Sequence, residues 1–216
     1  MHYLLSIIRR SALVIIILSF FVHNVFATLA TKEVKAYISN IKSVALEFEQ
    51  TDNRGNKASG MLIIDKPYKF RCNYYAPFPL LIIGNKNYVS VYDYEMEHLS
   101  RIKANENIFY FLLVDQINFD QEFDIISAKE QNNKYIIKLN HPDLNRESQI
   151  EFDKVTKQLI SLKIFEDNNI ITVDFIKTQK IRDVAGSLFI IQDPDIFGLP
   201  ERLDKVKLEK KYKIAN

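Results

Sequence analysis

The stretch that decides the fold runs from residue 57 to residue 93 and reads KASGMLIIDKPYKFRCNYYAPFPLLIIGNKNYVSVYD. In its middle, Phe70, Cys72 and Tyr74 alternate with polar residues, which is the two-residue period of a β-strand. Short apolar runs lie on both sides of this strand, and segments rich in Gly, Pro and Asn separate them. This pattern predicts short strands that follow one another through tight turns.

The same pattern continues on both sides of this stretch. Val44, Leu46 and Phe48 alternate with other residues before it, and further alternating segments extend to residue 175. We count ten to eleven short strands and find no regular alternation of strands with long helices. The sequence therefore predicts a mainly β protein with a few α-helices, built on one large antiparallel sheet that curls into a barrel or half-barrel.

Three predicted strands, at residues 61–64, 80–83 and 88–92, are apolar on both faces. An antiparallel sheet with one face in water shows a clean alternation of apolar and polar residues instead. One face must therefore contact helices, a ligand or a partner, unless these strands form an ordinary buried sheet centre.

Two helices are expected outside the strands. Val34, Tyr37, Ile38 and Ile41 have the i, i+3, i+4, i+7 spacing of an amphipathic helix, which should begin near Thr31. The segment 107–114, NIFYFLLV, predicts a short helix that is apolar almost all round, with a buried strand as the alternative.

Residues 1–27 have the features of a cleaved signal peptide. Arg9 and Arg10 precede an apolar run, and the segment ends in the sequence VFA, which places small residues before a cleavage point after Ala27. The uncharged run has about 12 residues, fewer than the roughly 20 that a membrane-spanning helix needs, and an uncleaved anchor is the alternative. We therefore expect residues 28–216 to form a single exported domain in a bacterial periplasm.

Composition excludes several classes of protein. The chain has 216 residues, of which 47% are hydrophobic and 12% aromatic, too many for a disordered protein. Beyond the signal peptide, basic and acidic residues are equal in number, which argues against nucleic-acid binding. The single cysteine, Cys72, excludes an intrachain disulfide and a cysteine-based metal cage. His98 and His141 are isolated, so an enzyme on a barrel scaffold is a weak alternative and neither a metal nor a cofactor is expected.

Several short motifs then follow one another in a fixed order. They are Phe48-Glu49-Gln50, Gly60 at the start of the next strand, Lys66-Pro67, Tyr74-Tyr75-Ala76-Pro77, Leu81-Ile82-Ile83, Val91-Tyr92-Asp93 and the segment from Leu188 to Pro194. Their order and spacing after a signal peptide resemble those of the outer-membrane lipoprotein carrier proteins, the LolA family. The last of them resembles the family's closing strand.

The resemblance implies an incomplete, open antiparallel β-barrel of ten to eleven strands covered by a helical lid. The apolar space beneath the lid would receive the acyl chains of a lipoprotein. The residues expected to line this cavity are Leu46, Phe48, Met61, Ile63, Phe70, Cys72, Tyr74, Ile82, Tyr88, Phe109, Phe111, Phe123 and Ile125. The lid helix would carry Val34, Tyr37, Ile38 and Ile41.

The resemblance also implies a monomeric periplasmic chaperone without enzymatic activity. Its expected partners are acylated lipoproteins, an inner-membrane lipoprotein-releasing ABC transporter, and an outer-membrane acceptor, either a receptor or the membrane itself. A periplasmic domain that senses lipid or lipoprotein on a related half-barrel is the alternative function.

The sequence departs from the family's pattern in three places. Lys66 stands where the family has a lid-latching arginine, Cys72 replaces a tryptophan, and Asn85-Lys86 replaces an Asp-Gly turn. Lysine keeps the charge of arginine but lacks its planar fork of donors, so either Lys66 or the nearby Arg71 is expected to latch the lid. The lysine-rich tail at residues 204–213 is expected to be solvated, with weak attraction to anionic headgroups as the alternative.

Overall fold

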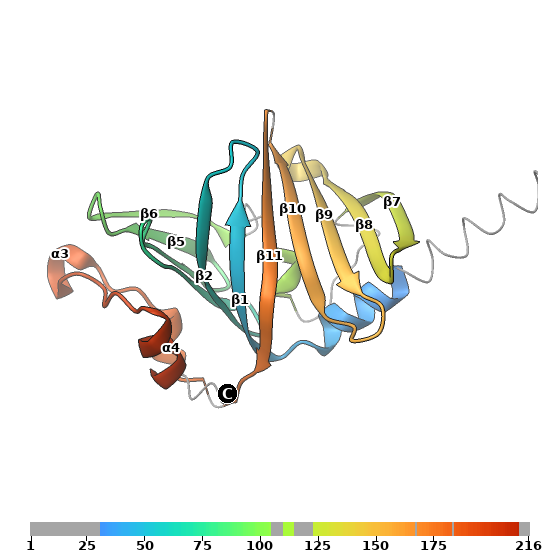
Figure 1. Ribbon diagram of the computed structural model, residues 1–216. Coiled ribbons are helices and arrows are strands. Elements are labelled where there is room, and N and C mark those ends of the chain that lie inside the picture. Colours follow the sequence, from blue (N-terminus) through green and yellow to red (C-terminus); the bar gives the residue numbers. More distant parts are fainter. Residues whose placement is uncertain (1–30, 105–109, 115–122, 167, 183, 212–216) are drawn as a thin grey trace, which may run out of the picture.

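The computed structural model describes residues 31–211, apart from 105–109, 115–122, 167 and 183. Its centre is one antiparallel sheet of eleven strands in the order β6-β5-β4-β3-β2-β1-β11-β10-β9-β8-β7. The strands are β1 (Ser43–Thr51), β2 (Lys57–Asp65), β3 (Lys69–Tyr74), β4 (Leu80–Gly84), β5 (Tyr88–Asp93), β6 (His98–Lys103), β7 (Asp124–Gln131), β8 (Lys134–His141), β9 (Arg146–Asp153), β10 (Leu159–Glu166) and β11 (Asn169–Lys180). Figure 1 shows that the sheet curves and stays open, with β6 and β7 at its edges. The predicted fold class, a mainly β protein with an open antiparallel sheet, is confirmed.

The chain forms this sheet as two meanders that meet at β1. Strands β1–β6 pair in sequence order, and so do β7–β11. The two series join because β11 pairs with β1, from Val44 opposite Lys180 to Thr51 opposite Thr172. We call β1–β6 the cavity half and β7–β11 the packed half.

The N-terminal helix spans residues 31–40, as the spacing of its apolar residues predicts. It covers the concave side of the packed half, where Val34, Ile38 and Ile41 are buried in the core of the sheet. The ring of Tyr37 meets that of Phe152 edge-on, with 4.8 Å between ring centroids. One apolar stripe of the helix thus completes a core that the strands alone would leave open.

The second predicted helix lies partly outside the described residues. Within segment 107–114, the described residues form the single 3₁₀ turn η2 (Tyr110–Leu112), and residues 107–109 lie outside the described residues. Leu112 and Leu113 are buried in the same core as the N-terminal helix. A second short 3₁₀ helix, η3 (Pro142–Leu144), connects β8 to β9.

The convex face of the cavity half is covered by the C-terminal segment, which we call the strap (residues 181–211). It contains η4 (Gly186–Phe189), α3 (Pro194–Phe197) and α4 (Lys205–Lys211). Phe189, Leu203 and Leu208 of the strap are buried against the outer side chains of the sheet. One expectation is therefore wrong: the segment from 188 to 194 adds no strand to the sheet. The described side chains of the tail are exposed, as expected, except that of Leu208, which packs against the sheet.

The strap explains why strands of the cavity half are apolar on both faces. Their inner residues face the concave core, and their outer residues face the strap. The packed half alternates instead, and its outer face carries charges such as Glu151, which pairs with Lys134 at 3.2 Å and Lys163 at 3.7 Å. Among the described residues, no helix combines the length and the apolar character that crossing a membrane requires.

Candidate functional site

An apolar cavity lies between the inner face of the cavity half and the η2 segment. Its volume is about 190 Å³. None of the described residues that line it is charged; they are Phe48, Leu62, Ile64, Phe70, Cys72, Tyr74, Ile82, Val89, Val91, Ile102, Leu112, Leu113, Val173 and Phe175. Strands β1–β6 and β11 supply all of them except the two leucines, which come from the η2 segment. The site is therefore a space between a sheet wall and a cover.

Two glycines make room for the aromatic rings of this wall. Gly60 lies opposite Phe48 in the pairing of β1 with β2, and Gly84 lies opposite Phe70 in the pairing of β3 with β4. A Cβ atom at Gly84 would stand 1.7 Å from the Phe70 ring, and one at Gly60 would stand 2.7 Å from the Phe48 ring. Both rings can thus occupy these positions only because the residues opposite them have no side chain.

The few polar groups of the cavity are neutral. The Tyr74 hydroxyl donates a hydrogen bond to Gln50 Oε1 at 2.8 Å. Burial raises the pKa of Tyr74 and of the Cys72 thiol, since removal from water disfavours the charged form of each. The cavity therefore offers an uncharged surface that suits hydrocarbon and penalises an ion.

Lys66 follows β2 and binds both segments that cover the concave side. Its Nζ donates to the carbonyl oxygen of Ile38 at 2.6 Å and to that of Val114 at 2.7 Å. In the same turn, the Tyr68 backbone N donates to the Leu113 oxygen at 2.8 Å. We call the helix 31–40 and residues 110–114 the lid, because this one turn fastens both of them to the sheet.

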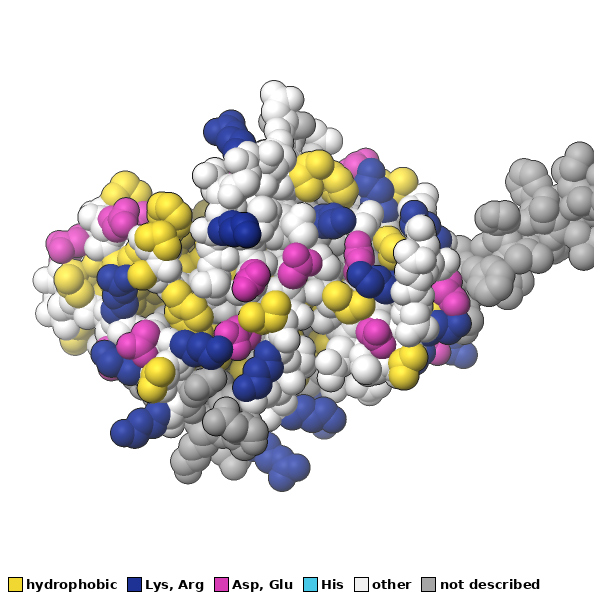
Figure 2. Space-filling view, in the orientation of Figure 1, with side chains coloured by type: hydrophobic (Ala, Val, Ile, Leu, Met, Phe, Trp, Pro, Cys, Tyr) yellow, Lys and Arg dark blue, Asp and Glu magenta, His cyan; other side chains and the backbone are white. Residues whose placement is uncertain are grey.

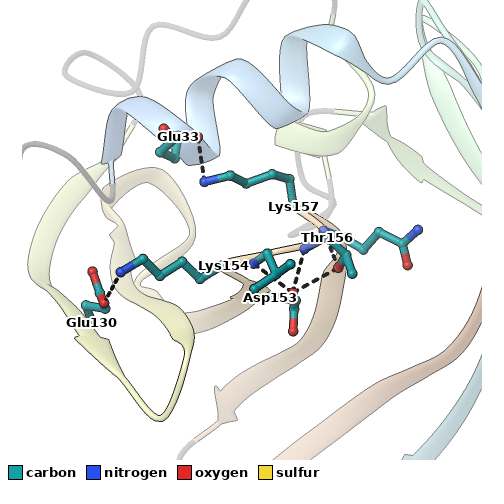
Figure 3. Close-up of polar contacts among 8 residues, drawn as sticks. Glu33, Glu130, Asp153, Lys154, Thr156 and Lys157 are labelled. Carbon is teal, nitrogen blue, oxygen red and sulfur yellow. Dashed lines mark hydrogen bonds and ion pairs between the residues drawn. The ribbon is translucent and has the colours of Figure 1, made fainter.

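A second lysine holds the other end of the lid helix. Lys157, in the turn between β9 and β10, points toward the helix and pairs with Glu33 at 3.1 Å (Figure 3). The same turn is shaped by Asp153, which accepts hydrogen bonds from the backbone of Val155 and Thr156. Lys157 also lies 5.0 Å from the centroid of the Tyr135 ring. Because this ion pair is partly exposed, it contributes little on its own.

Arg71 does not reach the lid. It lies on the outer face of the sheet, where its Nη1 donates to the Leu188 oxygen of the strap at 3.2 Å and its Nε donates to Asn73 Oδ1 at 2.8 Å. Of the two candidates for the latch, the structure therefore places Lys66 at the lid and Arg71 at the strap.

Five of the residues expected in the cavity line it together: Phe48, Phe70, Cys72, Tyr74 and Ile82. Leu46 and Phe123 are buried in the adjoining concave core without lining the cavity. Phe109 and the side chain of Phe111 lie outside the described residues.

Four expected cavity residues lie elsewhere, which corrects those expectations. Met61 and Ile63 are buried on the convex face under the strap. Tyr88 has 52% of its surface exposed and Ile125 has 36%. Met61, Ile63 and Tyr88 belong to strands that are apolar on both faces, so their composition does not reveal which alternate set points inward.

Strand pairing is the signal that could have identified the inward-facing residues of neighbouring strands. Residues directly opposite each other in an antiparallel pair point to the same face. Leu62 lies opposite Leu46 and also opposite Cys72, so it shares their inward face. Leu62, Ile64, Val89, Val91, Ile102, Leu112, Leu113, Val173 and Phe175 line the cavity and were missed.

The fold and the site define a class of protein: an open antiparallel β-sheet that encloses an apolar binding cavity beneath a lid. The model of one family, described as outer membrane lipoprotein carrier protein LolA, matches residues 39–192. The chain belongs to this family, which is a carrier or binding fold.

Three bacterial proteins are similar in sequence, and two of them are named lipoprotein carriers. The chain is 49% identical to the uncharacterised protein RP864 of Rickettsia prowazekii (strain Madrid E) over 184 residues, which cover 85% of this chain and 86% of that one. It is 26% identical to the outer-membrane lipoprotein carrier protein of Francisella philomiragia over 196 residues, which cover 86% of this chain and 95% of that protein. The outer-membrane lipoprotein carrier protein of Chromobacterium violaceum is 36% identical over 75 residues, which cover 33% of this chain and 36% of that protein.

Solved structures show similarity at low sequence identity. The LolA superfamily protein NE2245 from Nitrosomonas europaea has a TM-score of 0.41 and 7% identity, covering 74% of this chain and 97% of that chain. MucB has a TM-score of 0.44 and 8% identity, covering 77% and 62%.

Proposed function

We propose that this protein binds the acyl chains of lipoproteins in its apolar cavity and carries them across the periplasm toward the outer membrane. The observation that carries the proposal is the uncharged cavity on the inner face of the sheet, closed by a lid that Lys66 fastens. Membership of the carrier family and relatives named as lipoprotein carriers support it.

The energetics of acyl chains explain why such a cavity is useful. Exposure of each CH₂ group to water costs about 0.8 kcal/mol, so one acyl chain costs on the order of 10 kcal/mol. A lipoprotein therefore does not leave a membrane at a useful rate without a protein that shields its chains. A lining of aliphatic and aromatic side chains supplies that shield, and it releases the chains again because few directional contacts hold them.

The size of the cavity defines the state that the structure represents. Its volume is about 190 Å³, whereas a cavity of about 150 Å³ already accommodates benzene. It has room for a small part of one acyl chain. We infer that this is the closed, empty form, and that loading displaces the lid from the concave face.

The route proposed for the protein follows from the same function. Residues 1–27 would be removed on export, so exported protein should begin at Thr28 when its N-terminus is sequenced. A chain that keeps residues 1–27 and fractionates with membranes would contradict this. The lipoprotein would come from an inner-membrane lipoprotein-releasing ABC transporter and pass to an outer-membrane acceptor.

Uptake of a synthetic triacylated lipopeptide tests the function directly. Phe70 lines the cavity and is 5% exposed, so Phe70→Glu would place a carboxylate against the acyl chains. Val91→Glu introduces the same charge from another strand of the wall. Wild-type protein should form a water-soluble complex with the lipopeptide, and each variant should form at least tenfold less of this complex.

Tyr88→Glu is the matched control, because Tyr88 is exposed and does not line the cavity. Circular dichroism should show that the variants compared are folded. A wild-type protein that forms no complex overturns the proposal, and so do folded Phe70→Glu and Val91→Glu variants that take up the lipopeptide as well as Tyr88→Glu does.

A further inference from the structure

A second groove lies beside the lid helix and shares no residue with the acyl cavity. Its volume is about 830 Å³. The lid helix forms one wall, and the start of β1, the end of β11 and the turn between β9 and β10 form the rest. The lining residues that the inference uses are Tyr37, Ile41, Lys42, Lys157, Lys180 and Arg182.

The rim of this groove is strongly positive. Among the described residues that line it, the charged ones are Lys42, Lys157, Lys180 and Arg182 against the single acid Glu33. Lys157 pairs with Glu33, whereas the other three cations are exposed and form no ion pair with any described residue. Figure 2 shows Lys and Arg side chains along the lower margin of the molecule, below β1 and β11. Three uncompensated cations therefore face an opening that is wider than a small inorganic ion requires.

The groove also has an apolar part, beside the uncharged polar residues Asn40, Ser43, Thr156, Gln158 and Thr178. Ile41, Val44 and Ile181 are buried there, and Tyr37 is half-buried. A positive rim beside an apolar part matches a molecule that has a phosphate at one end and hydrocarbon at the other. That is the chemistry of an anionic phospholipid, whose headgroup attracts clustered Lys and Arg side chains at a membrane surface.

We propose that this groove docks the protein on membranes that contain anionic phospholipids, with the headgroup phosphates against Lys42, Lys180 and Arg182. The proposal goes beyond the carrier function, because it assigns a second site that binds without using the acyl cavity. The occupant is a lipid at a bilayer surface, since the groove is open and its cations are exposed.

The position of the groove relates docking to the lid. The chain leaves the lid helix at Ile41 and Lys42, which line the groove, and enters β1 at Ser43. The backbone N of Lys66 donates to the Lys42 oxygen at 2.8 Å, and the Lys66 side chain fastens the same helix. Docking through this groove thus holds the connection between the lid helix and β1 close to the membrane surface from which acyl chains are withdrawn.

Co-sedimentation with vesicles tests the proposal. Wild-type protein should bind vesicles of phosphatidylcholine with 30% phosphatidylglycerol more than tenfold better than vesicles of phosphatidylcholine alone, and 0.5 M salt should abolish the preference. The double variant Lys180→Glu with Arg182→Glu should lose at least tenfold of the binding, because each cation near a charged surface contributes strongly. All proteins compared have the same N-terminal residues, so any contribution of these residues to vesicle binding is the same in each.

Lys103→Glu with Lys129→Glu is the matched control, because it makes the same charge change at exposed positions of β6 and β7, far from the groove in the sheet order. It should retain the binding to within threefold. Equal losses in the two double variants would attribute binding to net charge and overturn the proposal, as would a wild-type protein without lipid preference.

Thermal unfolding identifies a folding defect, and Lys180→Gln with Arg182→Gln repeats the test without reversed charges. Uptake of detergent-dispersed lipopeptide should be unchanged in the groove variants. Docking and acyl binding can therefore fail separately.

Discussion

At the scale of single residues, the cavity depends on pairs of an aromatic ring and a glycine. Phe48 covers Gly60 and Phe70 covers Gly84, so the rings lie in the space that a side chain would occupy. Glycine is usually unfavourable in a strand, because it loses more conformational entropy on folding than other residues and has no side chain to pack. Here the packing of the rings offsets that cost.

Gly84→Ala should destabilise the protein by about 1–3 kcal/mol, because the new methyl group overlaps the Phe70 ring and forces it from its place. Urea unfolding followed by circular dichroism measures the change. In a Phe70→Ala background the same substitution should cost less than half as much, since the ring is gone. An equal cost in both backgrounds would show that the ring is not the cause.

The Cys72 thiol should react very slowly in the native protein. It is 8% exposed, and burial raises its pKa, so the thiolate that attacks a thiol reagent is scarce at pH 8. We expect a chromogenic thiol reagent to label Cys72 on the order of a hundredfold more slowly in the native state than in urea. The absorbance of the released chromophore measures both rates. Rates within threefold of each other would place the thiol at the surface instead.

At the scale of elements, one cation fastens the cover on each face of the sheet. Lys66 donates to two lid carbonyls on the concave side, and Arg71 donates to a strap carbonyl on the convex side. Backbone carbonyls at the ends of short helices and turns otherwise lack partners, so a charged donor satisfies them at a distance from the sheet. The two covers can therefore be loosened separately.

Lys66→Leu should release the lid. A hydrogen bond from a charged donor contributes about 1.5–3 kcal/mol, so loss of the two bonds should lower the stability of the empty form by at least that amount. Hydrogen exchange should accelerate at residues 31–40 and 110–114. The variant should still take up lipopeptide but deliver it poorly to acceptor liposomes, because the closed empty form no longer competes with the loaded one.

Lys66→Arg should do the reverse, with a more stable empty form and faster delivery, because the guanidinium can direct two donors at once. Arg71→Leu is the control: exchange should accelerate at residues 186–189 of the strap and stay unchanged at residues 31–40. If Arg71→Leu blocks delivery while Lys66→Leu transfers normally, the latch is assigned to the wrong residue.

The sequence predicted the elements better than their faces. The lid helix, the strands and the turn at Asn132 and Asn133, both with positive φ, follow from local spacing and turn chemistry. The inward set of β2 could not be chosen from composition, because Met61 and Ile63 are as apolar as Leu62 and Ile64. The two sets are distinguished by the pairing of Leu62 with Leu46 and by the strap, which covers Met61 and Ile63 and packs through single residues such as Leu208 that have no periodic pattern.

At the scale of the whole molecule, the two halves of the sheet have different tasks. The lid helix fills the concave side of the packed half, whereas the cavity half keeps an open space there and gains its support from the strap outside. Contacts between the strap and the convex face thus compensate for the contacts that the cavity half lacks on its concave side. The packed half is then the part whose core should set the overall stability, and its buried histidine gives that stability a pH dependence.

His141 should make the protein less stable as the pH falls below about 6.5. It is 5% exposed, its Nε2 lies 2.8 Å from Ser148 Oγ, and its ring meets Phe123 edge-on; burial lowers the pKa of His141 to about 4. Between these two values the unfolded chain binds the proton and the folded one does not, so stability present above pH 6.5 is lost toward pH 4. Urea midpoints measured at pH 7.5 and pH 5 should fall in the wild type and fall less in His141→Gln.

The window above pH 5 separates this effect from that of the carboxylates. For Glu151, burial acts to raise the pKa, but hydrogen bonds from Lys134 and Gln149 outweigh it, and the pKa of that carboxyl is lowered. The stability that Glu151 contributes is therefore present above its ordinary pKa, near 4.5, and is lost only below that value. Equal losses between pH 7.5 and pH 5 in the wild type and in His141→Gln would exclude His141 as the titrating group.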